Sequence, residues 1–205
     1  MTIAGLILSG GRSSRMGGGE KSLLPLLGAP LLRHCITRLS PQVDMLAINA
    51  NREVDTYAGF GLPVIRDTIP DYAGPLAGVL AGMRWAADAG ASHVATVAAD
   101  TPFFPDDLVA RLRDGRNAGD AIAMATTPDP IRKLSRHPTF ALWPVALADD
   151  LDAALRDGVR KIVAWTDRHG TSQVVFDIDR HDPFFNVNTP DDMLAAETIA
   201  AELGM

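Results

Sequence analysis

Residues 3–21 read IAGLILSGGRSSRMGGGEK, and this stretch decides the expected fold. Residues 3–8 form a short and almost wholly apolar run, which is typical of a strand buried on both faces of a parallel sheet. The run ends at Ser9, and five of the ten residues at 10–19 are glycine. The sequence therefore predicts a strand that leads into a glycine-rich loop at the edge of a sheet.

Similar short apolar runs recur along the chain, and stretches with helical periodicity separate them. This alternation predicts βαβ units around a parallel sheet, and so an α/β fold. Residues 139–143 predict a further strand, and residues 145–155 predict a helix. The recurring runs cover residues 45–48, 63–65, 93–98 and 121–125.

Two helices are marked by the residues at their starts. Pro75 suits the first position of a helix, and Thr189 is a candidate N-cap for a second helix that begins at Pro190. Gly78 and Gly82 lie four residues apart in the first helix, where glycine costs about 1 kcal/mol relative to alanine. Such a pair indicates close approach of the helix backbone to a strand or to a ligand, and packing against a strand is favoured.

Composition limits the kinds of protein that the chain can be. No linker or change in composition divides the 205 residues, so a single domain over residues 1–205 is expected. The start of the chain lacks the features of a secretion signal, and no apolar run is long enough to span a membrane. The net charge of −6 comes with scattered basic residues, which argues against nucleic-acid binding. The single cysteine, Cys35, is expected in the core, and a cytoplasmic location is expected.

The loop at residues 10–19 has the composition of a phosphate-binding site. Backbone N–H groups in such a loop can converge on one point, and Arg15 and Lys21 can add positive charge there. A P-loop requires glycine directly before the lysine, but Glu20 precedes Lys21, and the dinucleotide fingerprint is also missing. We therefore expect a triphosphate site that belongs to neither common class.

Asp100 is the candidate metal ligand. It follows the apolar run at residues 93–98, so its carboxylate is expected at the carboxyl edge of the sheet, where it can hold Mg²⁺ against phosphate oxygens. An aspartate before Pro102 can also be an ordinary turn residue. The neighbouring glycine-rich loop favours the metal.

Amide side chains mark the same edge of the sheet. Asn186 and Asn188 alternate ahead of the last helix, so they are expected to point to the same side and to contact an acceptor or complete a metal shell. Asn is also a common turn residue, which explains one of the two. Asn49 and Asn51 follow the second strand, and Asp67 follows the third. Each of these side chains is weak evidence by itself.

Other catalytic arrangements have no support in the sequence. The five histidines are dispersed, and neither a zinc-binding cluster nor a G-x-S-x-G elbow occurs. His137, which precedes Pro138, is the one histidine singled out for attention.

Taken together, these motifs closely resemble those of the molybdenum cofactor guanylyltransferase family. The resemblance spans nearly the whole chain, although residues 115–136 and 149–182 carry little of it. The motifs that carry it are LSGG at residues 8–11, RMGG at 15–18, Lys21, NANR at 49–52, GPLAG at 74–78, DTP at 100–102, HPT at 137–139 and NVNTP at 186–190.

The resemblance implies a Rossmann-like three-layer sandwich with a mostly parallel central sheet. It also implies that GTP and molybdenum-molybdopterin react to form the guanine dinucleotide cofactor and pyrophosphate, with Mg²⁺ as cofactor. Transient contact with molybdoenzyme chaperones is a further implication. Carried over by position, the residues that bind nucleotide or acceptor are Leu8, Ser9, Gly10, Gly11, Lys21, Asn49, Asp67, Asp100, Asn186 and Asn188, with Asp100 as metal ligand and Arg15, Lys21 and Asp100 as catalytic residues.

Two positions depart from the family pattern. Glu20 stands where the family has aspartate before the lysine, which puts that contact in doubt, and Ser9 replaces a common alanine. In related enzymes a second glycine in the loop, here Gly11, goes with guanine rather than cytosine. The alternatives are a molybdopterin cytidylyltransferase, a sugar-1-phosphate nucleotidyltransferase and a non-catalytic carrier of the molybdenum cofactor, of which the carrier would need no triphosphate loop.

Overall fold

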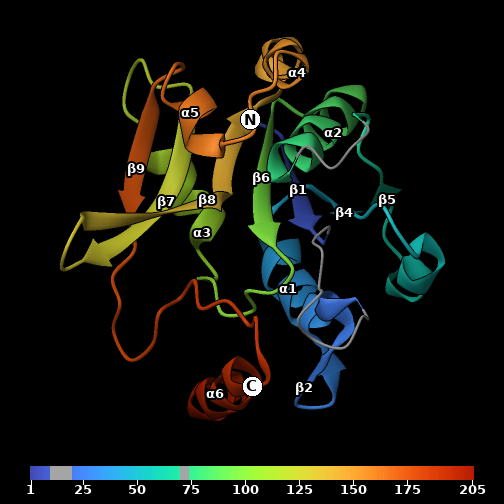
Figure 1. Cartoon of the computed structure of the whole chain (residues 1–205), viewed down its shortest axis with the longest axis vertical. Coiled ribbons are helices and arrows are strands. Elements are labelled where there is room, and N and C mark those ends of the chain that lie inside the picture. The colour runs from blue at the N-terminus through green and yellow to red at the C-terminus, as the bar shows by residue number, and fades with distance from the viewer. Residues whose placement is uncertain (10–19, 70–73) are drawn as a thin grey trace.

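A central sheet organises the protein in the computed structural model, which describes residues 1–9, 20–69 and 74–205. Within these residues seven strands pair in the order β5-β4-β1-β6-β8-β7-β9 (Figure 1). β8 pairs antiparallel with both β6 and β7, whereas the other neighbouring strands are parallel. The strands are β1 (Ile3–Leu8), β4 (Met45–Asn49), β5 (Val64–Ile65), β6 (His93–Ala98), β7 (Ile122–Asp129), β8 (Lys133–Pro144) and β9 (Thr171–Val175).

The mostly parallel sheet predicted from the apolar runs is confirmed. Every run became a strand, and residues 139–143 lie inside the longer strand β8. One connection differs from expectation, because a 3-10 helix, η3 (Val54–Phe60), rather than an α-helix joins β4 to β5. Strand β9 lies in the part of the sequence that carried little signal, and only its pairing with β7 identifies it as a strand.

Helices cover both faces of the sheet and form three layers. α1 (Leu31–Leu39) and α3 (Leu108–Asp114) pack on one face with Ile3 and Ile7 of β1. α2 (Pro75–Asp88), α4 (Ala148–Arg156) and α5 (Ile162–Thr166) pack on the other face with Leu6. Successive residues of β1 thus face opposite cores, as expected for a strand buried on both sides. None of the helices in the described ranges has the length and apolar character required to cross a membrane.

Cys35 is a core residue, as expected. It lies on α1 and is fully buried, and its thiol contacts the carbonyl oxygens of Ala98 and Ala99 at 3.6 Å. Burial, together with the nearby Asp100 carboxylate, raises the pKa of this thiol. The thiol therefore stays protonated beneath the end of β6.

The two glycines of α2 let this helix lie against the strands. A Cβ atom added at Gly82 would come 2.4 Å from Cδ2 of Leu6, and one added at Gly78 would come 2.3 Å from Oδ1 of Asn49. Both contacts are far too short for any larger residue. Close packing on a strand, rather than on a ligand, therefore explains the pair, and at Gly78 it also places the helix beside a predicted site residue.

The C-terminal helix α6 (Pro190–Glu202) lies apart from the sheet, beside the hairpin of β2 (Pro25–Leu26) and β3 (Ala29–Pro30) (Figure 1). Its start is a complete capping box: the Thr189 hydroxyl accepts from the Asp192 N–H, and the Asp192 carboxylate accepts from the Thr189 N–H. The predicted N-cap and first position are therefore confirmed. The remaining short 3-10 helices are η1 (Lys21–Leu23), η2 (Ser40–Gln42) and η4 (Val145–Leu147).

Replacing Thr189 by alanine should lower the free energy of unfolding by about 1 kcal/mol, because the Asp192 N–H at the start of α6 loses its side-chain acceptor. Urea denaturation measures this change. Thr198→Ala is the matched control, since Thr198 lies inside the same helix and its hydroxyl bonds to the Leu194 carbonyl. An equal loss in both variants would contradict a specific capping effect.

Candidate active site

The carboxyl ends of three parallel strands meet at one edge of the sheet. Leu8 at the end of β1 pairs in register with Asn49 of β4 on one side and with Ala98 of β6 on the other. A pocket of about 350 Å³ opens at this edge. It is lined by Leu8, Ser9, Glu20, Lys21, Ser22, Asn49, Asn51, Asp67, Gly74, Pro75, Ala98, Ala99, Asp100, Thr139, Asn186 and Asn188.

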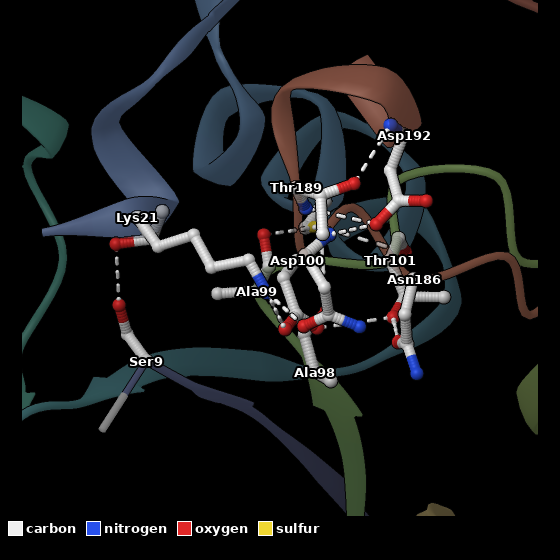
Figure 2. A network of polar contacts seen from close by, with 12 residues as sticks. Ser9, Lys21, Ala98, Ala99, Asp100, Thr101, Asn186, Thr189 and Asp192 are labelled. Atoms are coloured by element: carbon white, nitrogen blue, oxygen red, sulfur yellow. Dashed lines mark hydrogen bonds and ion pairs between the residues drawn. The ribbon is translucent and has the colours of Figure 1, made fainter. Parts of the chain in front are cut away.

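Lys21 and Asp100 form an ion pair inside this pocket. The Lys21 ammonium lies 2.8 Å from Oδ2 of Asp100 and also donates to the side-chain oxygen of Asn188 (Figure 2). The Lys21 and Asp100 side chains are only 16% and 30% exposed, respectively. Charges screened in this way from solvent interact more strongly than a pair on the surface. Lys21 is 79 positions from Asp100 and 167 positions from Asn188 in the sequence, so the fold alone brings them together.

The segment before α6 is held against the end of β6. The Val187 N–H donates to the Asp100 carbonyl at 2.9 Å, and the Thr101 hydroxyl donates to the side-chain oxygen of Asn186. The Asp192 carboxylate of the capping box also accepts from the Asn188 N–H at 2.8 Å. The two asparagines therefore line the same pocket, as the sequence predicted, and the cap of α6 orients the second of them.

The Asp192 carboxylate has a lowered pKa. The hydrogen bond from the Asn188 N–H is its main cause, and the Thr189 groups and the charge of Lys21 act in the same direction. This carboxylate therefore remains ionised and keeps both backbone N–H groups bound. The start of α6 thus contributes to the geometry of the pocket without lining it.

A second polar group lies at the ends of β4 and β5. The side-chain amides of Asn49 and Asn51 donate to separate oxygens of the Asp67 carboxylate, each at 2.8 Å. Asn49 also donates to the Ile65 carbonyl, and the Asp67 N–H donates back to Asn51. The three side chains therefore form a closed set, whose position is further limited by Gly78 of α2.

Eight of the predicted binding residues line the pocket together, whereas Gly10, Gly11 and Arg15 lie outside the described residues. The sequence reasoning did not select Ser22, Gly74, Pro75 or Thr139 as binding residues. Gly74, Pro75 and Thr139 belong to motifs of the family resemblance, but Ser22 carries no sequence signal of its own. Their place in the pocket follows from the packing of the chain.

The oxygen donors of the pocket are of the kind that Mg²⁺ prefers. Asp100 supplies a carboxylate, and the side-chain oxygen of Asn188 lies beside it on the same lysine ammonium. Within the described ranges no three His, Cys, Asp or Glu side chains converge as a metal-binding group. One carboxylate with phosphate oxygens and water is a usual way to hold Mg²⁺, so these residues fit this ion rather than a metal held by protein ligands alone.

His137 does not line the pocket. It lies on β8, where its ring stacks on Phe184 with centroids 4.3 Å apart and its Nε2 lies 2.9 Å from the Thr127 hydroxyl. Burial lowers its pKa, while Asp182 acts in the opposite direction. The histidine singled out in the sequence is thus a packing residue in this structure.

The fold and the pocket define the class of protein. A parallel sheet with polar groups at its carboxyl edge and a lysine–aspartate pair beside a glycine-rich segment is the arrangement of a nucleotide-binding enzyme. Residues 5–172 match the MobA-like NTP transferase domain family. The chain belongs to this family and is a nucleotidyltransferase.

Similar proteins agree with this assignment. The molybdenum cofactor guanylyltransferase of Cupriavidus taiwanensis is 46% identical over 196 residues, which cover 95% of this chain and 96% of that protein. The protein of the same name from Burkholderia lata is 49% identical over 199 residues, 95% of each chain.

A solved structure shows the same Rossmann-like fold. The molybdopterin-guanine dinucleotide biosynthesis protein A of Archaeoglobus fulgidus superimposes with a TM-score of 0.72 at 24% identity. The alignment covers 98% of this chain and all of the other. The expected three-layer α/β fold is therefore confirmed.

The half-buried position of His137 predicts a pH-dependent stability. Because its pKa is lower in the folded state than the ordinary 6.5, the unfolded chain binds more protons as the pH falls below about 6.5. The free energy of unfolding should therefore decrease as the pH falls, and the slope between about pH 5 and 7 should be smaller in His137→Gln. Urea denaturation across this range tests the prediction. Above about pH 7.5 the difference in the free energy of unfolding between the wild type and His137→Gln should no longer change with pH.

Proposed function

We propose that this enzyme transfers GMP from GTP to molybdenum-molybdopterin, forming the guanine dinucleotide cofactor and pyrophosphate. The observation that carries the proposal is the partly buried Lys21–Asp100 pair. It lies at the carboxyl ends of β6 and of β1, the strand that precedes the glycine-rich segment in the sequence. The names of the relatives, which match nearly full length, support this choice of nucleotide and acceptor.

The pocket has two halves that suit the two parts of a nucleotide. On one side, Lys21 suits a triphosphate, because an ammonium stabilises phosphate oxygens. On the other side, Asn49 and Asp67 offer amide and carboxylate groups that suit the base and ribose. One nucleoside triphosphate would therefore lie along the pocket from Asp67 to Asp100, across the ends of β5, β4, β1 and β6.

Asp100 and the side-chain oxygen of Asn188 would hold Mg²⁺. The ion, when bound, would neutralise phosphate charge and orient the oxygens of the triphosphate. Lys21 contacts both of these oxygen donors. Entry of the nucleotide would therefore move the ammonium from these side chains onto phosphate oxygens.

The proposed chemistry is an in-line displacement. A phosphate oxygen of the acceptor attacks the α-phosphorus of GTP and forms a new P–O bond. The bond from that phosphorus to the oxygen that bridges the α- and β-phosphates breaks, and pyrophosphate leaves with the electron pair. No side chain becomes covalently attached, so the residues act by positioning and by stabilising charge. Lys21 would stabilise the departing pyrophosphate, whereas Asn186 and Asn188 would face the acceptor.

Asp100→Asn and Lys21→Ala should retain the fold but lower the rate of transfer by about 10² to 10³, because each removes a charge used in the transition state. The rate of GTP- and Mg²⁺-dependent pyrophosphate release measures this effect. Asp114→Asn is the matched control, since Asp114 forms an ion pair with Arg113 on the exposed surface. Turnover near the wild-type rate in a folded Asp100 or Lys21 variant would remove these residues from the mechanism.

The choice of substrates is tested by pyrophosphate release from the purified protein with Mg²⁺. Release is expected with GTP and molybdenum-loaded molybdopterin, and it should stop when the ion is chelated. Release with CTP and the same acceptor would identify a cytidylyltransferase, and release with a sugar 1-phosphate would identify a sugar nucleotidyltransferase. No release with any pair would support a carrier.

A further inference from the structure

Tyr57 is a buried residue whose hydroxyl group lies beneath the candidate site. It belongs to the 3-10 helix η3 that follows β4, and its side chain is 0% exposed. Its ring packs near Phe60, with centroids 6.4 Å apart, within the core that lies on the α1 side of the sheet. A phenol oxygen in such a place needs hydrogen-bond partners, because an unpaired buried hydroxyl costs free energy.

The partners of this hydroxyl come from both ends of the glycine-rich segment. Ser9, directly before residues 10–19, lies 2.9 Å from the Tyr57 oxygen. Glu20 and Ser22, directly after the segment and on either side of Lys21, lie 3.3 Å from it. One phenol therefore contacts the residue that enters the segment and the two residues that flank the catalytic lysine.

These hydroxyl groups can form one continuous chain of hydrogen bonds. The Ser9 hydroxyl donates to Ser22 at 2.7 Å, Ser22 can donate to Tyr57, and Tyr57 can donate either to Ser9 at 2.9 Å or to the Glu20 carboxylate at 3.3 Å. Each hydroxyl then donates its single hydrogen once. Burial is the main cause that raises the pKa of Tyr57, and Glu20 also raises it, so the phenol keeps its proton.

This chain of hydrogen bonds also gives a role to Glu20, which stands where the family has aspartate. The Glu20 side chain reaches the Tyr57 oxygen from the residue next to Lys21. The serines at positions 9 and 22, which are 7% and 4% exposed, supply the other two groups of the network. Their hydroxyls bond to each other and contact Tyr57 within this network.

We propose that Tyr57 is a positioning residue that sets the place of Lys21 in the nucleotide site by bonding to both of its neighbours and to the end of β1. It touches neither nucleotide nor metal and acts through Ser22, Glu20 and Ser9. The inference rests on the proposed function only for the role of Lys21 as a phosphate ligand.

Tyr57→Phe tests the inference because it removes the hydroxyl and keeps the ring. Calorimetric titration with GTP and Mg²⁺ should show an affinity about tenfold lower than that of the wild type. In the Lys21→Ala background the same substitution should change affinity by less than about twofold, since its effect passes through the lysine. A loss of the same size in both backgrounds would show a merely structural role and would overturn the inference.

Two further variants complete this cycle. Ser22→Ala removes the middle hydroxyl of the chain, so it should weaken GTP binding in the same Lys21-dependent way and serves if Tyr57→Phe folds poorly. Thr126→Val is the matched control, because Thr126 is 0% exposed and its hydroxyl bonds to the Val174 carbonyl, away from the residues that line the pocket. GTP affinity should not change in the control.

Amide hydrogen exchange provides a readout that needs no nucleotide. Peptides covering residues 20–26 should exchange faster in Tyr57→Phe than in the wild type, whereas peptides covering β7 should not change. Unchanged exchange in residues 20–26 would overturn the inference even if GTP binds normally. If the wild type itself fails to bind GTP, the proposed function is wrong, and the exchange rates still decide whether Tyr57 holds the residues around Lys21.

Discussion

The parallel pairing of β4, β1 and β6 is the constraint on which the candidate site depends. Parallel strands end at the same edge of a sheet, and the register aligns Asn49, Leu8 and Ala98 there. Side chains that follow these strands are therefore gathered at one place, although they lie far apart in the sequence. Every residue with a proposed role is positioned relative to this edge.

The packing of α2 adds a second constraint to the same edge. Gly82 and Gly78 allow the helix backbone to lie directly against Leu6 and Asn49, so the helix packs closely on this face of the sheet. The Asn49 amide, limited on this side by Gly78, is held on the other by Asp67. A residue that supports the fold and a residue that lines the pocket are therefore in contact, and changes at one must affect the other.

The charged side chains in and beside the pocket are engaged in contacts within the chain. Lys21 lies on Asp100 and Asn188, and Asp192 is occupied by the N–H groups at the start of α6. The lysine is in turn flanked by Glu20 and Ser22, which contact the buried Tyr57. The site is thus built in two layers, with polar groups at the surface of the pocket and a hydroxyl network beneath them that orders the chain around the lysine.

The sequence by itself determined the α/β class, most strands of the sheet, the start of α6 and half of the residues that line the pocket. These features are local, since apolar runs, capping residues and glycine-rich segments act over a few neighbouring positions. Only the tertiary structure decided that Lys21 meets Asp100 and Asn188, that His137 packs on Phe184 outside the pocket, and that Tyr57 joins Ser9 to Ser22. No local pattern encodes these contacts, because their partners are brought together by strand order and helix packing across long separations in the chain.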